Sequence, residues 1–534
     1  MKRLCIIFIA GAAVLATSCN KFLDINTNPN SAVSTTPELI IPQALTGTAA
    51  NLNQFNTYGE QIGGYAANAG GYGGFGTAIS YNFSSADYPG LWTTSYDNLE
   101  DYQTILNKTD GQLPNYSFVN AAARIMRVIG FELLTDAYNS VPYTDALKAD
   151  SALTPTYSDP IAVYKDLADQ LDKAIATINT GIAAPGIATM GPTDVLFKGD
   201  MVKWKQLANT IKLRLIIFGT GKVTFTNTTF TADGFLTTDA LINPTYTRDI
   251  GRQNPKWDRW GYTSTGSDAT KSWIPSTWIL SFYNGTKLQD SGRGKAIYYL
   301  YTPTYLSTPP TPTTPVLGTG QLGVESVNTP KSPAGSFWYP STNRVGGSSG
   351  NTTGVLKGPD AGYPLITAAE SYFLQAEAKM KGILATGATD ADLFKAGITA
   401  SFSYLYAGPT STAVTTRNPT TDANTYMTDN AASPLVNYSL ATTPAQKLEA
   451  IITQKYIAMN FVNSEVGWND YRRTHYPAVS GTSATSTFAS TVSESTRPDK
   501  LPTRVLYPVV EGSLNSTNVP KSINPFSSLI FWAF

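Results

Sequence analysis

The clearest pattern of hydrophobic and polar positions lies in the segment FKGDMVKWKQLANTIKLRL, Phe197 to Leu215. Asp200 is suited to cap a helix at its start and Gly219 to end one. The apolar residues of this segment recur three or four positions apart and so predict one stripe of an α-helix. They are Met201, Trp204, Leu207, Ala208, Ile211, Leu215 and Phe218. Since this stripe needs other helices to cover it, the segment predicts a core helix and says nothing about function.

The same helical spacing recurs on both sides of this segment. Thr36-Pro37-Glu38 is typical of a helix start, because proline follows a capping residue. Further helices are expected over Phe118 to Leu134, from Asp159-Pro160 onward, and after residues 366, 390 and 444. Helix starts near 118, 160 and 200 lie about forty residues apart, which favours stacked helix pairs of the tetratricopeptide kind, although the consensus residues of that repeat are missing.

Between these helical parts the pattern mostly disappears. Residues of about 223–363 are expected to form long irregular loops, and loops of this length in a compact protein are usually functional. Gly63 to Phe83 is too rich in glycine for a helix interior and carries aromatic residues on a pliable loop. Stretches rich in Thr, Ser and Asn at 408–441 and 479–494 are expected to be surface loops, and Pro142 is expected in a turn.

These patterns predict a mainly α fold, with a tetratricopeptide-like scaffold of helix pairs over about 36–222 and 364–476 and few short strands. The loop-rich region of about 223–363 is the expected place for ligand binding.

Composition narrows the classes of function. Of the 534 residues only 14% are charged, which suits an exported protein, and Lys+Arg equals Asp+Glu at 38 each. This balance gives no indication of nucleic-acid binding. The only cysteines are Cys5 and Cys19, which excludes a disulfide scaffold and a cysteine-based zinc site. No metal ion and no cofactor are expected.

The first eighteen residues have the pattern of a signal peptide. Lys2 and Arg3 precede the apolar run CIIFIAGAAVLA, which is too short to span a bilayer well. The following LATSC resembles a lipobox, after which bacterial lipoproteins are cleaved and acylated. Cys19 is therefore the predicted lipid attachment, and Asn20 after it favours the outer membrane.

Motifs for catalysis are weak. His475 is the only histidine and lies beside two arginines, which would oppose its protonation. GGSSG at 346–350 and GTGQLG at 318–323 match nucleophile and phosphate-binding patterns, but the strands and helices that those motifs require are absent around them. Both matches are attributed to the high glycine content.

Paired carboxylates remain open as a catalytic alternative. Glu370 and Glu377 lie seven residues apart on one face of a predicted helix, and a glycosidase needs two such groups about 5 to 10 Å apart. Within an alanine-rich core helix, however, they are more suited to bond the backbone or an arginine such as Arg472 or Arg473.

Aromatic residues on loops suggest a binding function. An exposed Trp or Tyr can cover the flat C–H face of a sugar, while Asn, Asp and Arg bond hydroxyls at its edge. The aromatic candidates are Tyr72, Phe75, Tyr81, Trp257, Trp260, Tyr262 and Trp273, and the polar candidates are Asn254, Asp258 and Arg259. For each aromatic residue the alternative is that it anchors its own loop.

Several segments, in this order, resemble the SusD/RagB family of nutrient-binding outer-membrane lipoproteins, in its SusD-like-2 branch. They are the lipobox with CNKFLDINTNPN, then DAYNSVPYTDAL, the Phe197–Leu215 segment, AAESYFLQAEAKMKG, IITQKYIAMNFVNSEVGWNDYRRTHYP and LPTRVLYPVVE. Two departures occur: Asp290-Ser291-Gly292-Arg293 replaces a common Asp-Pro-Arg turn, and the tail ends in Ala533-Phe534 where an acidic residue is common.

The resemblance implies one SusD-like domain over 19–534, built from four tetratricopeptide-like helix pairs with irregular loops. It implies a lipid-anchored protein on the cell surface, forming a lid over a partner SusC-like TonB-dependent outer-membrane barrel. The ligand would be an oligosaccharide or, in some relatives, a peptide, and the protein would not be an enzyme. The alternatives are a glycan-degrading surface enzyme and a structural or adhesive surface lipoprotein.

Overall fold

The computed structural model describes residues 36–148, 151–270, 272–298, 319–324, 353–409 and 417–534. The predicted signal peptide, Cys19 and the GGSSG motif lie outside the described residues.

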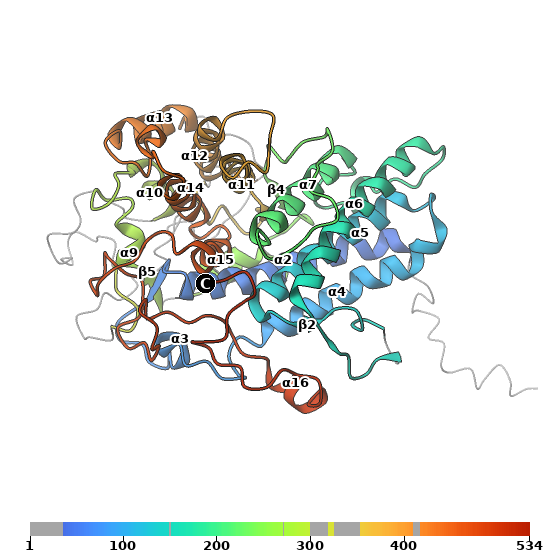
Figure 1. The fold of residues 1–534 in the computed structure, drawn as a ribbon, viewed down its shortest axis with the longest axis horizontal. Coiled ribbons are helices and arrows are strands. Elements are labelled where there is room, and N and C mark those ends of the chain that lie inside the picture. Colours follow the sequence, from blue (N-terminus) through green and yellow to red (C-terminus); the bar gives the residue numbers. More distant parts are fainter. Residues whose placement is uncertain (1–35, 149–150, 271, 299–318, 325–352, 410–416) are drawn as a thin grey trace, which may run out of the picture.

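Long helices that pack side by side form the first half of the scaffold (Figure 1). Each helix packs on the next one of this set along the chain. They are α2 (Pro37–Ile62), α4 (Gly90–Thr109), α5 (Ser117–Tyr138), α6 (Pro160–Ala183) and α7 (Met201–Phe218).

The second half repeats this arrangement after the loop region. Here α11 packs on both α12 and α14, α12 packs on α13, and α14 packs on α15. These helices are α11 (Ala368–Met380), α12 (Asp390–Tyr406), α13 (Pro419–Asp429), α14 (Pro444–Met459) and α15 (Ser464–Thr474). Contacts of α7 with α11 and of α2 with α15 join the two halves into one body. The predicted mainly α fold with tetratricopeptide-like helix pairs is confirmed.

Helix α7, from which the sequence pattern was read, begins and ends as predicted. The Asp200 carboxylate accepts hydrogen bonds from the backbone N–H of Val202 and Lys203, and Gly219 follows the last helical residue. The helix is buried more widely than one stripe, because Lys212 on another side is also fully buried. Its ammonium donates to Asp172 at 2.7 Å, which explains how a charge is accommodated there.

Short strands and short helices shape the connections. The antiparallel strand pairs are β1 (Ala66–Asn68) with β5 (Trp273–Pro275), β2 (Val141–Pro142) with β3 (Tyr157–Ser158), and β4 (Ala240–Ile242) with β6 (Tyr363–Ile366). The short helices are α3 (Thr77–Ser80), α8 (Pro255–Trp260), α9 (Thr277–Leu280), α10 (Ser291–Ile297) and α16 (Val509–Leu514), with 3₁₀ turns η1 (Asp110–Gln112), η3 (Gly191–Thr193) and η5 (Tyr438–Leu440).

Two local predictions were wrong. Pro142 lies in strand β2, where its ring takes the place of one backbone donor. The stretch 408–441 was predicted as a surface loop but contains helix α13, whose start is capped by Asn418 and followed by Pro419 at the first helical position.

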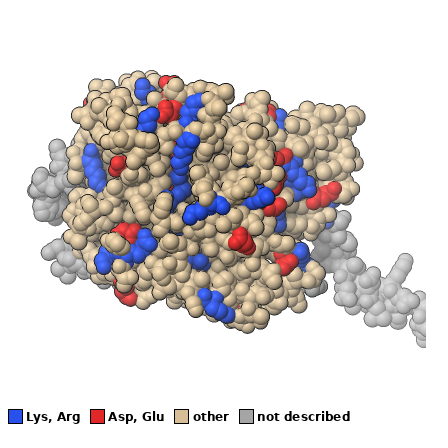
Figure 2. Space-filling model, viewed as in Figure 1, with Lys and Arg blue, Asp and Glu red and all other residues tan. Residues whose placement is uncertain are grey.

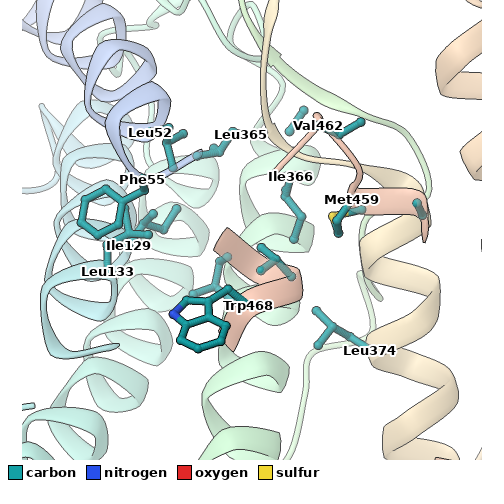
Figure 3. Packing of buried hydrophobic residues seen from close by; sticks show 14 of the residues in the cluster. Leu52, Phe55, Ile129, Leu133, Leu365, Ile366, Leu374, Met459, Val462 and Trp468 are labelled. Carbon is teal, nitrogen blue, oxygen red and sulfur yellow. The ribbon is translucent and has the colours of Figure 1, made fainter. Parts of the chain in front are cut away.

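The core is continuous where the two halves meet. Trp468 of α15 lies among apolar side chains of the first and second halves, including Phe55 of α2 and Ile366 of β6 (Figure 3). Gly59 of α2 approaches the backbone of Glu465 so closely that a Cβ there would lie 2.2 Å from its nitrogen. In the described part of the chain, no helix is long and apolar enough to cross a membrane.

Candidate functional site

A cavity of about 950 Å³ opens where α15 ends, and we call it the terminal cleft. Its walls come from the end of α15, from the irregular stretch 476–500 and from Phe534. This volume lies within the range of small-molecule and oligosaccharide sites in proteins. The C-terminus lies near the middle of the molecular face in Figure 1, beside α15.

Hydroxyl groups cover much of one wall of the terminal cleft. The stretch after α15 is rich in serine and threonine, and six of these residues line the cleft: Ser480, Thr482, Thr487, Ser490, Thr491 and Ser493. Each hydroxyl can donate one hydrogen bond and accept two. A wall of this kind suits a ligand that itself carries many hydroxyl groups.

A row of rings leads from the core to the lining of the terminal cleft. Trp468 stacks on Tyr471 with ring centroids 6.0 Å apart, Tyr471 lies 6.0 Å from the His475 ring, and His475 lies 5.5 Å from Phe534. Trp468 is fully buried, whereas the Phe534 side chain is 64% exposed. The buried end holds the row in place, and the exposed end presents aromatic surface to the cleft.

The charges in the terminal cleft largely compensate one another. Arg497 bonds Asp499 at 3.1 Å, and the Tyr471 hydroxyl also donates to Asp499. Burial and the charge of Asp499 raise the pKa of Tyr471, so its hydroxyl stays protonated at neutral pH. Figure 2 shows that Lys, Arg, Asp and Glu make up only a small part of this face. The cleft therefore favours an uncharged, polar ligand.

The segment Gly320–Val324 connects the cleft wall to the strand pair β1–β5. Asn68 of β1 accepts a hydrogen bond from the Gly323 N–H at 2.8 Å and donates to the Val324 carbonyl. The Gln321 amide donates to the Ala489 carbonyl inside the cleft wall at 3.3 Å. These contacts assign the described part of GTGQLG a structural role.

Among the predicted aromatic residues near β1, Tyr81 contacts this wall. Tyr81 is fully buried, and its hydroxyl accepts a hydrogen bond from the Ser490 N–H at 3.2 Å, so it supports the cleft from beneath. Phe75 packs edge-on against buried Trp273 at 5.4 Å. Tyr72 is the most open of this group, at 37% exposed.

The predicted residues around α8 are mostly buried. Asn254 caps α8 by accepting from the Lys256 and Trp257 N–H groups, and it donates to the Ala361 carbonyl at 2.8 Å. Trp257, Trp260 and Tyr262 are at most 2% exposed, and Trp260 packs on Phe461.

These buried rings pack within the fold, which agrees with the alternative that they anchor their own loops, while their contact with a ligand stays a prediction. Asp258 and Arg259 are exposed, with the Arg259 guanidinium 5.7 Å from the Trp260 ring. For Tyr72, Phe75, Asp258 and Arg259, ligand contact stays a prediction.

The two carboxylates considered for catalysis are held in ion pairs. Glu370 accepts from Arg214 at 2.9 Å, and Glu377 accepts from Arg473 at 2.6 Å. Burial opposes ionisation of Glu377, but the charges of Arg473 and Lys381 outweigh it and lower its pKa to about 2. Burial raises the pKa of Glu370 in spite of Arg214. Since both are fully buried and paired, they are not placed to act on a bound sugar.

Sequence analysis did not identify the residues that line the terminal cleft. The stretch 479–494 was recognised only as a polar loop, and His475 was weighed only as a catalytic base. The Ala533-Phe534 end was noted only as a departure from the family pattern, and nothing in the local pattern placed it beside α15.

The helix-pair scaffold, with a polar, ligand-sized cleft on its loops, belongs to the tetratricopeptide-like class of folds. Two family matches make this specific. Residues 29–232 match the SusD-like-2 family, described as starch-binding associating with outer membrane, and residues 356–528 match the SusD-like family, described as SusD and RagB outer membrane lipoprotein. The chain belongs to the SusD/RagB family, with the expected SusD-like-2 branch matched in its first half.

Solved structures show the same fold. A chitin-binding protein superposes with a TM-score of 0.63 at 22% identity, covering 93% of this chain and 99% of that one. A SusD homologue from Bacteroides uniformis gives 0.65 at 20% identity, with the same coverage of both chains. A chitin-binding SusD homologue from Flavobacterium johnsoniae gives 0.64 at 19% identity, covering 92% and 98%. Among curated proteins, none matches this chain.

Proposed function

We propose that this protein captures an oligosaccharide at the cell surface and delivers it, as a lid, to a partner SusC-like TonB-dependent transporter. The terminal cleft carries this proposal, because it combines hydroxyl-bearing walls with exposed aromatic surface and compensated charges. Sugars offer hydroxyl groups at their edges and C–H groups on their faces, and the hydroxyl groups and aromatic rings among the lining residues match these two features.

The related structures support a glycan as the ligand class. Two solved neighbours are chitin-binding proteins by name, and one matching family is described as starch-binding. Exposed Tyr72 and half-buried Phe75, on the loop after β1, are further aromatic side chains that a glycan could contact.

Membrane attachment and transport complete the proposal. Residues 1–18 would be removed, Cys19 acylated, and residues 19–534 would form one lipid-anchored domain on the outer membrane. The family descriptions of an outer-membrane lipoprotein agree with this placement.

We also propose that the bound glycan is not cleaved. A glycosidase needs two carboxyl groups beside the sugar. Asp499 is the single carboxylate side chain among the residues described as lining the cleft, and it is paired with Arg497.

Thermal unfolding tests the function. The chain from Asn20 onward, without lipid, is unfolded in the presence of a panel of oligosaccharides and short peptides, and each mixture is checked for cleavage products. A ligand that binds only the folded state raises the midpoint temperature of unfolding. At a ligand concentration a hundred times the dissociation constant it stabilises the folded state by about 2.7 kcal/mol. The proposal predicts a shift with one glycan class and no products. A shift with peptides alone would overturn the glycan assignment, and cleavage products would overturn the non-catalytic role.

A further inference from the structure

A second cavity, of about 390 Å³, lies between α10, α12 and α13 and shares no lining residue with the terminal cleft. We call it the upper pocket, since these helices lie at the top left of Figure 1. Its walls carry ionisable side chains of both signs: Lys295, Arg417, Asp422 and Asp429. This mixture differs from the hydroxyl-rich terminal cleft and indicates another kind of ligand.

Several charged side chains of the upper pocket form no ion pair within the described part of the chain. Among the described residues, Lys295, Arg417 and Asp429 form no ion pair. The Arg417 Nη1 is buried and has no hydrogen-bond partner. Asp422 accepts one hydrogen bond, from the Tyr406 hydroxyl at 2.6 Å. A buried N–H group without a hydrogen-bond partner costs free energy. A ligand acceptor that bonds the Arg417 Nη1 group would remove this cost and so strengthen binding.

Ion-pair and hydrogen-bond contacts hold the base of the upper pocket. Behind it Asp290 and fully buried Arg293 form an ion pair, and the Arg293 guanidinium lies 4.6 Å from the Tyr426 ring. Asn430 holds Gln289 from both sides, accepting from its N–H and donating to its carbonyl, each at 2.9 Å. Charged groups of both signs therefore line one pocket whose base is held by these contacts.

We propose that the upper pocket binds a small zwitterion of the amino-acid or dipeptide class. Its carboxylate would bond Arg417 and Lys295, and its ammonium group would bond Asp422 and Asp429. Charge-assisted hydrogen bonds of this kind are about twice as strong as neutral ones, and arginine is suited to hold a carboxylate through two parallel bonds. The Tyr406 ring, 5.3 Å from the Arg417 guanidinium, fixes the direction of that fork. This site does not depend on the proposed capture of glycans.

Calorimetric titration of the chain without its signal peptide tests this inference. The probe is glycylglycine; the comparison ligands are N-acetylglycinamide, which lacks both charges, and a neutral disaccharide. Glycylglycine is expected to bind at one site and the two comparison ligands are not expected to compete for it. Arg417→Gln and Asp429→Asn are each expected to weaken glycylglycine binding by about ten-fold or more.

Matched variants control for charge and folding. Lys295→Gln is expected to weaken glycylglycine binding. Lys395→Gln, which removes an exposed lysine of α12 that does not line the pocket, is expected to leave binding unchanged. The inference is overturned if glycylglycine does not bind, if N-acetylglycinamide binds equally well, or if Lys395→Gln weakens binding as much as Lys295→Gln. Binding of the disaccharide in place of glycylglycine would reassign the pocket to glycans and would also overturn it.

Discussion

Buried charged residues join the helices through ion pairs. Arg214 of α7 bonds Glu132 of α5 at 2.6 Å and Glu370 of α11 at 2.9 Å, so one guanidinium joins three helices. Arg473 of α15 bonds Glu377 of α11 in the same way. Removing one member of a buried pair leaves the other charge without compensation, which makes these pairs costly to break.

Glu377→Gln is therefore expected to destabilise the protein. It removes the charge that compensates Arg473 and Lys381, and the expected loss is about 3 kcal/mol in the free energy of unfolding at pH 7. Chemical denaturation measures this loss. Glu100→Gln, at an exposed position on α4, is the matched control and should change stability by less than about 0.5 kcal/mol. Equal stability of the two variants would contradict the assignment.

The same pair gives a pH dependence. The pKa of Glu377 is about 2 when folded, against 4.5 for the ordinary group, so the unfolded chain takes up this proton first as the pH falls. The stabilisation is fully present above pH 4.5 and is lost toward pH 2. The difference in unfolding free energy between wild type and Glu377→Gln should shrink over that range, and a difference that grows instead would show that the sign is wrong.

Residue identity alone could not separate ligand-binding aromatic residues from anchoring ones. Trp257 and Trp260 have the composition and loop position of sugar-binding residues, yet their rings are buried. The capping by Asn254 was the available signal, because it places the following residues on a short helix with one side toward the core. The pairing of Glu377 with arginine was predicted and is confirmed.

At the level of elements, helices with strong caps and a clear apolar period were predicted well. Asp159 and Asp200 cap α6 and α7 as expected. Helix α13 was missed because its sequence PTTDANTYMTD buries only Ala423 and Tyr426, too few apolar positions to show a period. Its start signal, Asn418-Pro419, was present but carried little weight without that period.

The crossing of α2 and α15 depends on one glycine. Because a Cβ at Gly59 would overlap the backbone of Glu465, Gly59→Ala must push the two helices apart, with an expected cost of about 3 kcal/mol. Gly512→Ala, in α16 with open space around it, is the control and should be neutral or slightly stabilising. Thermal unfolding of the two variants distinguishes them, and a neutral Gly59→Ala would contradict the close crossing.

At the scale of the whole molecule, the terminal cleft joins segments far apart in the chain. Gln321, the end of α15 and Phe534 meet there only after the two halves of the scaffold have packed. The local spacing of apolar residues does not predict which distant segments come into contact. It was sufficient to predict the helices and therefore the fold class. This difference explains why the family was recognisable from ordered motifs while the lining of the cleft was not.

Attachment of the whole molecule to the membrane is proposed to depend on Cys19. Cys19→Ser should abolish acylation and shift the protein from the outer-membrane fraction to the soluble fraction. The reason is that no acyl chain remains to bury CH₂ groups in the bilayer. Fractionation followed by immunoblotting measures this shift, with Cys5→Ser as the control that should stay attached. Retention of Cys19→Ser in the membrane would contradict the predicted lipid anchor.

The most direct test of the account is calorimetric titration of the strongest-binding oligosaccharide into wild type, Tyr476→Ala and Tyr372→Ala. Tyr476 lines the terminal cleft, whereas Tyr372 is a tyrosine of similar partial burial on α11, outside it. The account predicts that Tyr476→Ala weakens binding by about ten-fold, as expected for the loss of a ring that covers a sugar face, and that Tyr372→Ala binds like wild type. Equal affinity of all three proteins would show that the glycan binds elsewhere and would contradict the central claim.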